Sequence, residues 1–290
     1  MESIQRVKER IASIKSTRQI MQSMRLVSTA KVQRARAKME ANRSFSEEIA
    51  RILRLAVGNA DLKNHRFMRE NTDALESKSA VIVLSADRGL CGGYNVNVCR
   101  QANTLIKGLG GVKVITVGQK ARDYFRRRMP DSLAGSHIGI SETPIFHSAE
   151  EVSADALEWY ENGEVDAVYL VYTEFKNILT QNPVAKKILP LEPEDGEEPV
   201  ETYVNYEPEI GAFLSHLVPF YMYSTVYGAM LESSACEQSA RLSSMTSAVK
   251  NSDDIVEQLI LQLNRTRQAS ITQELNEISG GVRALEKKQG

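Results

Sequence analysis

Helix-breaking residues are distributed very unevenly along this chain of 290 residues. No glycine or proline precedes Gly58, and Gly228 is the one such residue between Phe220 and Ser279. Because glycine and proline interrupt helices more strongly than any other residues, both ends of the chain are free to form continuous helices. A helix over residues 2–57 would be roughly 80 Å long, which is more than a compact domain can contain. We therefore expect both ends to extend beyond the middle of the chain.

Apolar residues recur in both terminal stretches at the narrow spacing of a coiled coil. The N-terminal seam includes Ile4, Val7, Ile11 and Ile14. The C-terminal seam has two runs, one residue out of phase: Val249, Val256, Leu259 and Leu263, then Ile271, Leu275, Ile278, Val282 and Leu285. A lone helix with such a seam is unstable, so we expect the two ends to pair antiparallel. Arg18 and Arg25 interrupt the seam, and we expect groups outside the partner helix to satisfy them.

Residues 78–207 have a different pattern, in which β-branched runs alternate with helical stretches. The runs are residues 80–85, 112–117 and 165–172, and the helical stretches are 97–107, 119–128 and 149–162. Such alternation predicts a mainly parallel sheet with helices on both faces. The expected fold class is thus α/β with long helices, an antiparallel coiled coil plus an inserted Rossmann-like α/β domain. The expected domains are the N-terminal helix (1–57), the α/β domain (78–207) and a C-terminal helical region (208–290), whose long helix begins at about residue 220.

Positive charge is concentrated in the N-terminal stretch. Residues 1–56 carry 13 Lys and Arg against 5 Asp and Glu, whereas residues 57–219 carry 16 against 24. A basic helix permits nucleic-acid binding on electrostatic grounds alone. However, Phe45 is the one aromatic residue in that helix, and the sequence pI is near 6.5. We therefore expect no nucleic acid, and favour a solvated face or a protein partner with acidic loops.

The most enzyme-like segment is the glycine loop ADRGLCGGYN at residues 86–95, which follows the first β-branched run. It lacks both the lysine of a P-loop and the GxGxxG spacing of a dinucleotide site. We therefore expect Gly89, Gly92 and Gly93 to permit a tight turn or close packing. Cys91 and Cys99 have no recognisable general base and are expected to be small buried residues. The sequence indicates no catalytic residue, no cofactor and no metal site.

Three motifs resemble the gamma subunits of rotary F-type ATP synthases, over essentially the whole chain. They are residues 14–31 (IKSTRQIMQSMRLVSTAK), residues 85–93 (SADRGLCGG), and the C-terminal segments EQSARLSSM and LNRTRQASITQELNEISGG. The resemblance implies a non-catalytic central rotor shaft, coupling ion-driven rotation of a membrane ring to sequential changes at the catalytic beta subunits. The chain has no inserted loop with a cysteine pair like that of chloroplast members, so we expect a bacterial type without a thiol switch.

The resemblance also implies partners and contact residues. The partners are the alpha and beta subunits of the catalytic hexamer, the epsilon subunit and the ring of membrane c subunits, on the cytoplasmic face of the cell membrane. Contacts with the hexamer fall at Met24, Arg25, Lys31, Arg34, Arg241, Gln268 and Thr272. Ile278, Val282 and Leu285 would form the tip of the shaft in an apolar bearing sleeve. The driving ion, proton or sodium, is left open.

Two other functions are compatible with parts of the sequence. A nucleotide-binding α/β enzyme would require a ligand at residues 89–93. A static coiled-coil scaffold would require the long helices, but not the polar residues Gln268 and Thr272 close to the end of the last one.

Overall fold

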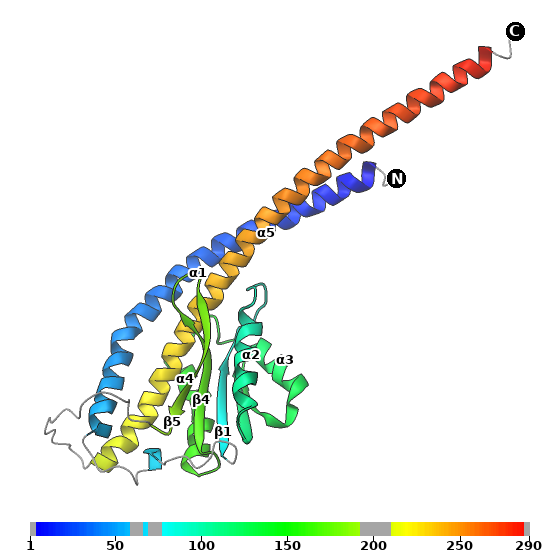
Figure 1. The fold of residues 1–290 in the computed structure, drawn as a ribbon. Helices are drawn as coiled ribbons and strands as arrows, with labels where there is room; N and C mark the ends of the chain where they lie inside the picture. Colours follow the sequence, from blue (N-terminus) through cyan, green and yellow to red (C-terminus); the bar gives the residue numbers. More distant parts are fainter. Residues whose placement is uncertain (1–3, 59–65, 69–76, 192–209, 287–290) are drawn as a thin grey trace. The chain divides into compact units, whose positions relative to one another are not determined.

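The computed structural model describes residues 4–58, 66–68, 77–191 and 210–286, with side chains as far as residue 281. The chain divides into two compact units, Met1–Val27 with Ser244–Gly290, and Ser28–Ser243. We call the first the helix-pair unit and the second the sheet unit. Two long helices, α1 (Ile4–Gly58) and α5 (Ile210–Glu286), run through both units (Figure 1). The absence of helix breakers at the two ends therefore predicted long helices correctly.

The sheet unit contains a five-stranded sheet with the order β3-β2-β1-β4-β5. The strands are β1 (Lys78–Leu84), β2 (Gly111–Val117), β3 (Leu133–His137), β4 (Ala167–Phe175) and β5 (Gln181–Leu189). The first four strands are parallel, and β5 pairs antiparallel with β4. In the central register, Ala80 of β1 lies between Lys113 of β2 and Val168 of β4. The expected mainly parallel sheet is confirmed.

Helices cover both faces of this sheet. One face carries α2 (Tyr94–Ile106) and α3 (Gln119–Arg128), and the other carries α4 (Phe146–Glu161) and α5 (Figure 1). Because side chains alternate along a strand, β1 contributes to both cores. Val81 and Val83 pack with α2 and α3, whereas Ile82 and Leu84 pack with α4, α5 and the end of α1. Short 3-10 turns occur at Arg66–Met68 and Pro130–Ser132.

Two strands, β3 and β5, were not predicted from the sequence, and both lie at the edges of the sheet. β3 reads LAGSH and alternates between half-buried and exposed residues, so it has no continuous apolar run. β5 contains Pro183 and two lysines, which are residues that weaken a strand pattern. Proline and lysine are nonetheless common on edge strands, where they hinder pairing with a further strand. The predicted helices agree with α2, α3 and α4 to within three residues at each end.

The last helix begins earlier than the sequence predicts. The expected start was about residue 220, because of Pro219, but α5 begins at Ile210 and includes this proline. Leu214, Val218 and Met222 lie one turn apart on the same face, and all three are buried in the core of the sheet unit. Their burial offsets the roughly 3 kcal/mol that an interior proline costs a helix. The expected domain boundaries stay predictions, because residues 59–65, 69–76 and 192–209 lie outside the described residues.

In the helix-pair unit, α1 and α5 pair antiparallel. Val7 and Ile11 of α1 are buried against Leu259 of α5, with Ile14, Val256 and Leu263 packed around them. The Arg18 Nε donates to Asp253 Oδ1 at 2.5 Å, and its Nη1 donates to Gln22. The expectation that groups outside the partner helix satisfy Arg18 is therefore wrong. A long side chain at the seam can reach past the apolar contact to a carboxylate on its flank.

The second run of the C-terminal seam is exposed. Ile271, Leu275 and Ile278 are 47%, 61% and 65% exposed. The reason is the antiparallel register, in which α1 residues near 7 and 11 already meet α5 at Leu259. Since α1 begins at Ile4, α5 continues beyond the residues that α1 can cover.

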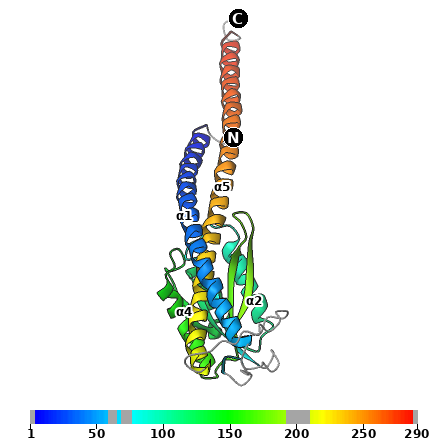
Figure 2. The same ribbon diagram turned by 90° about the vertical axis from the view of Figure 1, so that its left-hand side faces the viewer.

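In the sheet unit the two long helices also lie side by side (Figure 2). Gly228 of α5 faces Asn42 and Ser46 of α1, and a Cβ at this position would lie 3.6 Å from each of these side chains. The Phe220 ring of α5 contacts Phe45 of α1 and Phe146 of α4, each with ring centroids 5.9 Å apart. These contacts attach both helices to the sheet unit.

Candidate functional site

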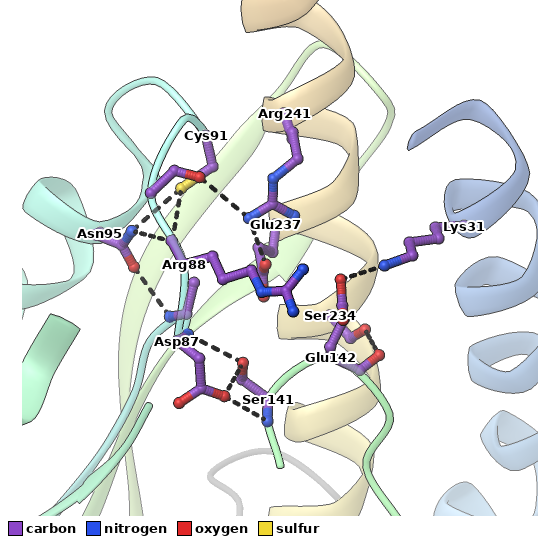
Figure 3. Close-up of polar contacts among 12 residues, drawn as sticks. Lys31, Asp87, Arg88, Cys91, Asn95, Ser141, Glu142, Ser234, Glu237 and Arg241 are labelled. Atoms are coloured by element: carbon purple, nitrogen blue, oxygen red, sulfur yellow. Dashed lines mark hydrogen bonds and ion pairs between the residues drawn. The ribbon is translucent and has the colours of Figure 1, made fainter. Parts of the chain in front are cut away.

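The strand order places a topological switch point at the carboxyl ends of β1 and β4, where chain connections leave in opposite directions. Open α/β sheets bind their ligands in this crevice, and here the glycine loop at residues 86–95 follows β1. In this chain the glycine loop packs against α5, where Cys91 and Tyr94 lie beside Cys236, and Arg241 of α5 lies next to the loop (Figure 3). A void of about 10 Å³ lies beside the ends of β1 and β2, with Ser85, Val117 and Tyr94 in its lining. It has room for about one water molecule.

Asp87 organises the glycine loop. Its carboxylate accepts hydrogen bonds from the backbone N–H groups of Gln119 (3.0 Å) and Gly139 (2.9 Å) and from the Ser141 hydroxyl (2.7 Å). Partial burial raises the pKa of Asp87, but hydrogen bonds from Gly139, Ser141 and Gln119 outweigh burial, so the pKa is lowered overall. The loop is therefore held by a carboxylate that carries its charge at neutral pH.

This arrangement gives a prediction for Asp87→Asn. A group whose folded-state pKa is lowered adds stability above its unfolded pKa, and that stability is lost as the pH falls through the folded value. We expect the variant to lose about 2 kcal/mol of unfolding free energy near neutral pH, where the charged acceptor is present. The deficit should begin to shrink as the pH falls below about 4, where the aspartate of the unfolded chain becomes protonated, and should shrink further as the pH falls through the lowered folded-state pKa. Urea unfolding at both pH values measures it, and a deficit independent of pH would contradict the assignment.

Glu237 and Arg241 form a buried ion pair on α5, one helical turn apart. The Arg241 Nη2 lies 2.7 Å from Glu237 Oε1, and their side chains are 7% and 3% exposed. Arg241 also donates to the backbone oxygen of Gly89 at 3.3 Å, which attaches the glycine loop to α5. Burial raises the pKa of Glu237, and the Arg241 charge only partly offsets it. The pair therefore helps to attach the glycine loop to α5. Removal of either partner would leave a buried charge without its counterion and lower the free energy of unfolding.

Glu142 connects the sheet unit to both long helices. Its carboxylate accepts a hydrogen bond from Lys31 of α1, and its backbone oxygen accepts one from Ser234 of α5 at 3.1 Å. The hydrogen bond from Lys31 lowers the pKa of Glu142. We call the cluster of Lys31, Gly89, Glu142, Ser234, Glu237 and Arg241 the junction (Figure 3).

The end of β4 is attached to α5 in the same way. The backbone N–H of Phe175 donates to Glu232 at 3.3 Å, and the Cys236 thiol donates to the Thr173 oxygen at 3.4 Å. The Arg36 guanidinium of α1 lies 5.8 Å from the centre of the Phe175 ring. Burial raises the pKa of Glu232. The carboxyl ends of both central strands are therefore fixed to the helices.

The cysteines are packing residues, as expected for Cys91 and Cys99. Cys91, Cys99 and Cys236 are all free and buried. Burial raises the pKa of Cys91, and raises that of Cys99 to about 12. Such thiols are protonated at neutral pH and are poor nucleophiles. In the glycine loop, Gly92 adopts a φ of 56°, which fits the expected role in a tight turn.

The structure places the predicted contact residues in three environments. Met24 and Arg25 are half-buried on α1, whereas Arg34, Gln268, Thr272 and Ile278 are exposed. Lys31 and Arg241 are part of the junction, so within this chain both already have an acidic partner. The side chains of Val282 and Leu285 lie outside the described residues. Contact of these residues with other subunits stays a prediction.

A groove of about 620 Å³ lies on the surface of the helix-pair unit, lined by residues of α1 and α5. Its walls carry amide, hydroxyl and charged groups, which include Arg18, Gln19, Gln22, Ser23 and Asp253. The surface therefore offers many hydrogen-bonding groups, with Leu26 and Val256 as apolar contacts. Among the described residues, no helix is both long and apolar enough to span a bilayer.

Several residues of the junction, and Asp87 of the glycine loop, were not identified from the sequence. Glu237 lies in the quoted motif EQSARLSSM and Asp87 in SADRGLCGG, but neither received a role there. A buried carboxylate one turn before an arginine on a helix is the signal that would have indicated the Glu237–Arg241 pair. Glu142 and Ser234 carry no such local signal, because their partners lie 111 and 92 residues away.

Comparisons with known proteins agree with this architecture. A family model described as ATP synthase matches residues 3–285. The ATP synthase gamma chains of Pelotomaculum thermopropionicum and Desulforamulus reducens are 42% and 41% identical, each covering 99% of this chain and 100% of the relative. The gamma chain of Acetobacterium woodii, named sodium ion specific, is 39% identical over 98% of this chain and 99% of that protein.

A solved structure shares the fold as well. A chain of the Euglena gracilis mitochondrial ATP synthase, solved with OSCP, F1 and c-ring in rotational state 3, superposes with a TM-score of 0.71. It is 20% identical, and the match covers 99% of this chain and 96% of that chain. The static scaffold and the nucleotide-binding enzyme are not favoured. This chain belongs to the ATP synthase gamma-chain family, and is a non-catalytic subunit that forms the central rotor stalk.

Proposed function

We propose that the helix-pair unit turns inside a hexamer of alpha and beta subunits, and that its changing face sets the conformations of the catalytic beta sites in sequence. The observation that carries this proposal is the antiparallel pairing of α1 and α5 through Val7, Ile11 and Leu259, reinforced by Arg18 and Asp253. Neither helix is interrupted within its described bounds. Two packed, continuous helices resist bending and twisting better than one, and a shaft that carries torque needs that stiffness.

Contacts with the hexamer are proposed at Met24, Arg25, Gln268 and Thr272, together with Lys31, Arg34 and Arg241. The exposed Gln268 and Thr272 offer neutral hydrogen-bonding groups, although the Thr272 hydroxyl also donates to the Gln268 backbone oxygen at 2.9 Å. Each such bond contributes only about 1 kcal/mol in water. A rotating surface needs contacts of this strength, because it must release each partner before it meets the next.

The free end of α5 is proposed to be the tip, with Ile278, Val282 and Leu285 in an apolar sleeve of the hexamer. Ile278 is 65% exposed in the isolated chain, so its apolar side chain is available to pack against an apolar surface of another subunit. An apolar sleeve has no directed hydrogen bonds, so it permits sliding.

Truncation after Leu275 tests the tip. We expect the truncated chain to assemble with alpha and beta subunits but to deliver less torque, because the upper bearing is lost. Its sheet unit should unfold at an unchanged urea concentration, since none of the removed residues whose side chains the structure describes, up to Gly281, belongs to either core of that unit. A truncation that unfolds the sheet unit, or leaves the torque unchanged, would contradict the proposal. Stall force in single-molecule rotation and urea unfolding are the two measurements.

The sheet unit is proposed to be the foot of the shaft, in contact with the epsilon subunit and the ring of membrane c subunits. The complex would then lie on the cytoplasmic face of the cell membrane, with this chain as a peripheral component. The junction would carry torque from the foot to the helices, because it links Glu142 to α1 and α5 and the glycine loop to α5. The choice between protons and sodium ions would be made by the ring.

The experiment is co-expression with the alpha and beta subunits of the same organism. We expect assembled, rotation-coupled ATPase activity only when this chain is present. A variant with a disrupted helix pair serves as the negative control. Replacement of Ile11, a buried seam residue, by aspartate should prevent the helix pair from forming and abolish assembly. Equal activity with and without the chain would exclude the rotor function.

A further inference from the structure

Glu142 lies among positive groups that come from three different elements. The Lys31 ammonium of α1 bonds its carboxylate, and the charges of Arg88 in the glycine loop and Arg241 on α5 both favour its ionised form (Figure 3). These residues lie far apart in the sequence, so the fold alone brings them together. A carboxylate that is bonded to a lysine, with two arginine charges that favour its ionised form, is held as an acidic ligand would be.

The three cations differ in their burial and in the partners that they have within the chain. Arg241 is buried and paired with Glu237. Arg88 is exposed, and among the described residues its guanidinium has no hydrogen bond or ion pair. Lys31 and Glu142 have side chains that are 35% and 30% exposed. An ion pair with that much solvent access contributes little free energy. Another carboxylate can therefore replace Glu142 as the partner of Lys31 with little loss of free energy.

We propose that Glu142 is an internal stand-in for a carboxylate of an acidic loop on a hexamer subunit, and that Lys31 and Arg88 bind that loop when it docks. The inference rests on the proposed function, and adds that Glu142 competes with the acidic loop for Lys31 and Arg88. The partner that binds here is an acidic protein loop, because a group that takes the place of Glu142 must be a single carboxylate, such as an Asp or Glu side chain. A nucleic acid carries a continuous row of phosphates and binds best to an extended row of cations, whereas Glu142 is flanked by two accessible ones, Lys31 and Arg88.

Exchange would change only one of the two attachments of Glu142. Its backbone oxygen stays bonded to Ser234 of α5, whereas its carboxylate loses Lys31 of α1. The segment that carries Glu142 therefore stays fixed to α5 while its link to α1 opens. Docking of the acidic loop would thus alter how α1 is held in the sheet unit.

Binding of a labelled acidic peptide, rich in Asp and Glu, to the full chain at low salt tests the competition. Glu142→Gln is expected to raise the affinity about fivefold, since the competing charge is gone. Adding Lys31→Gln should remove most of that gain. The control is Glu150→Gln, which removes an equal charge from Glu150 on α4, whose side chain is 42% exposed and lies outside the junction. A gain as large in this control, or no gain in Glu142→Gln, would overturn the proposal.

Zero-length carbodiimide cross-linking tests it in the native chain. An amide between Lys31 and Glu142 is expected in the free chain. In the ATPase-active complex this link should fall about fivefold and be replaced by a link from Lys31 to an acidic residue of a hexamer subunit. An unchanged internal link in an active complex would overturn the inference while leaving the rotor function intact. Failure of the chain to assemble into any complex would contradict the rotor function, and the peptide experiment then decides the competition by itself.

Discussion

Replacing Arg241 by alanine is expected to lower the unfolding free energy of the sheet unit by about 3 kcal/mol, because it leaves the buried Glu237 without its cation. The same change removes the hydrogen bond to Gly89, so the glycine loop also loses its attachment to α5. Urea unfolding followed by the fluorescence of Trp159 measures the loss. Trp159 is the single tryptophan of the chain and lies on α4 of the sheet unit.

The loss should depend on pH. Burial already raises the pKa of Glu237, and without the positive charge of Arg241 it should rise further. A carboxyl group with a raised folded-state pKa destabilises the fold as the pH rises through that value. The deficit of the variant should therefore shrink as the pH falls through the raised folded-state pKa of Glu237 towards about 4.3, the ordinary value for a glutamate. A deficit that grows on acidification would contradict this explanation.

Two further variants separate charge from packing. The double change Glu237→Leu with Arg241→Met removes both charges and should cost less than Arg241→Ala, because no uncompensated charge remains. Arg43→Ala removes the arginine of an exposed pair of the same kind, with Glu47 one turn away, and should leave stability unchanged within error. If Arg241→Ala were as harmless as Arg43→Ala, the junction would contribute nothing to stability.

Gly118→Ala is expected to lower the unfolding free energy by at least about 3 kcal/mol. Gly118 lies between β2 and α3 with a φ of 89°, and a Cβ there would lie 2.4 Å from the Ser85 backbone oxygen. Neither atom can move aside easily, because the Gly118 N–H donates to His137 at 2.8 Å and the Ser85 N–H donates to Val117 at 2.9 Å. The same urea titration measures the loss.

Gly139 provides a matched control, since it also has a positive φ, of 81°, but nothing lies within 4 Å of its Cβ position. Gly139→Ala should therefore cost only about 1 kcal/mol, the conformational part of the penalty. Equal losses in the two variants would show that the close approach to Ser85 is unimportant.

The long helices and the sheet could be predicted from the sequence because their signals are local. The absence of breakers indicates α1 and α5, and the β-branched runs indicate β1, β2 and β4. Pro219 misplaced the start of α5, since the burial of Leu214 and Val218 is a tertiary effect that no local pattern reveals. The expectation for Arg18 was wrong for the same reason, because its partner Asp253 is 235 residues away.

The site was harder to predict than the fold. Lys31 and Arg241 were identified only through the family resemblance, as surfaces for other subunits. The structure shows that each already has an acidic partner within the chain, Glu142 and Glu237. Pairing between α1, the glycine loop and α5 depends on how three distant segments pack, and one sequence does not contain that information. Gly118 was overlooked because it lies outside the quoted motifs.

Single-molecule rotation tests the central claim most directly. Leu179, in the turn between β4 and β5, is 87% exposed, and all three native cysteines are buried, so Leu179→Cys provides a selective attachment point for a bead. With the hexamer of alpha and beta subunits fixed to a surface, ATP should drive continuous rotation of the bead in one direction. A stationary bead on a complex that hydrolyses ATP at the normal rate would contradict the account of this chain as a rotor shaft.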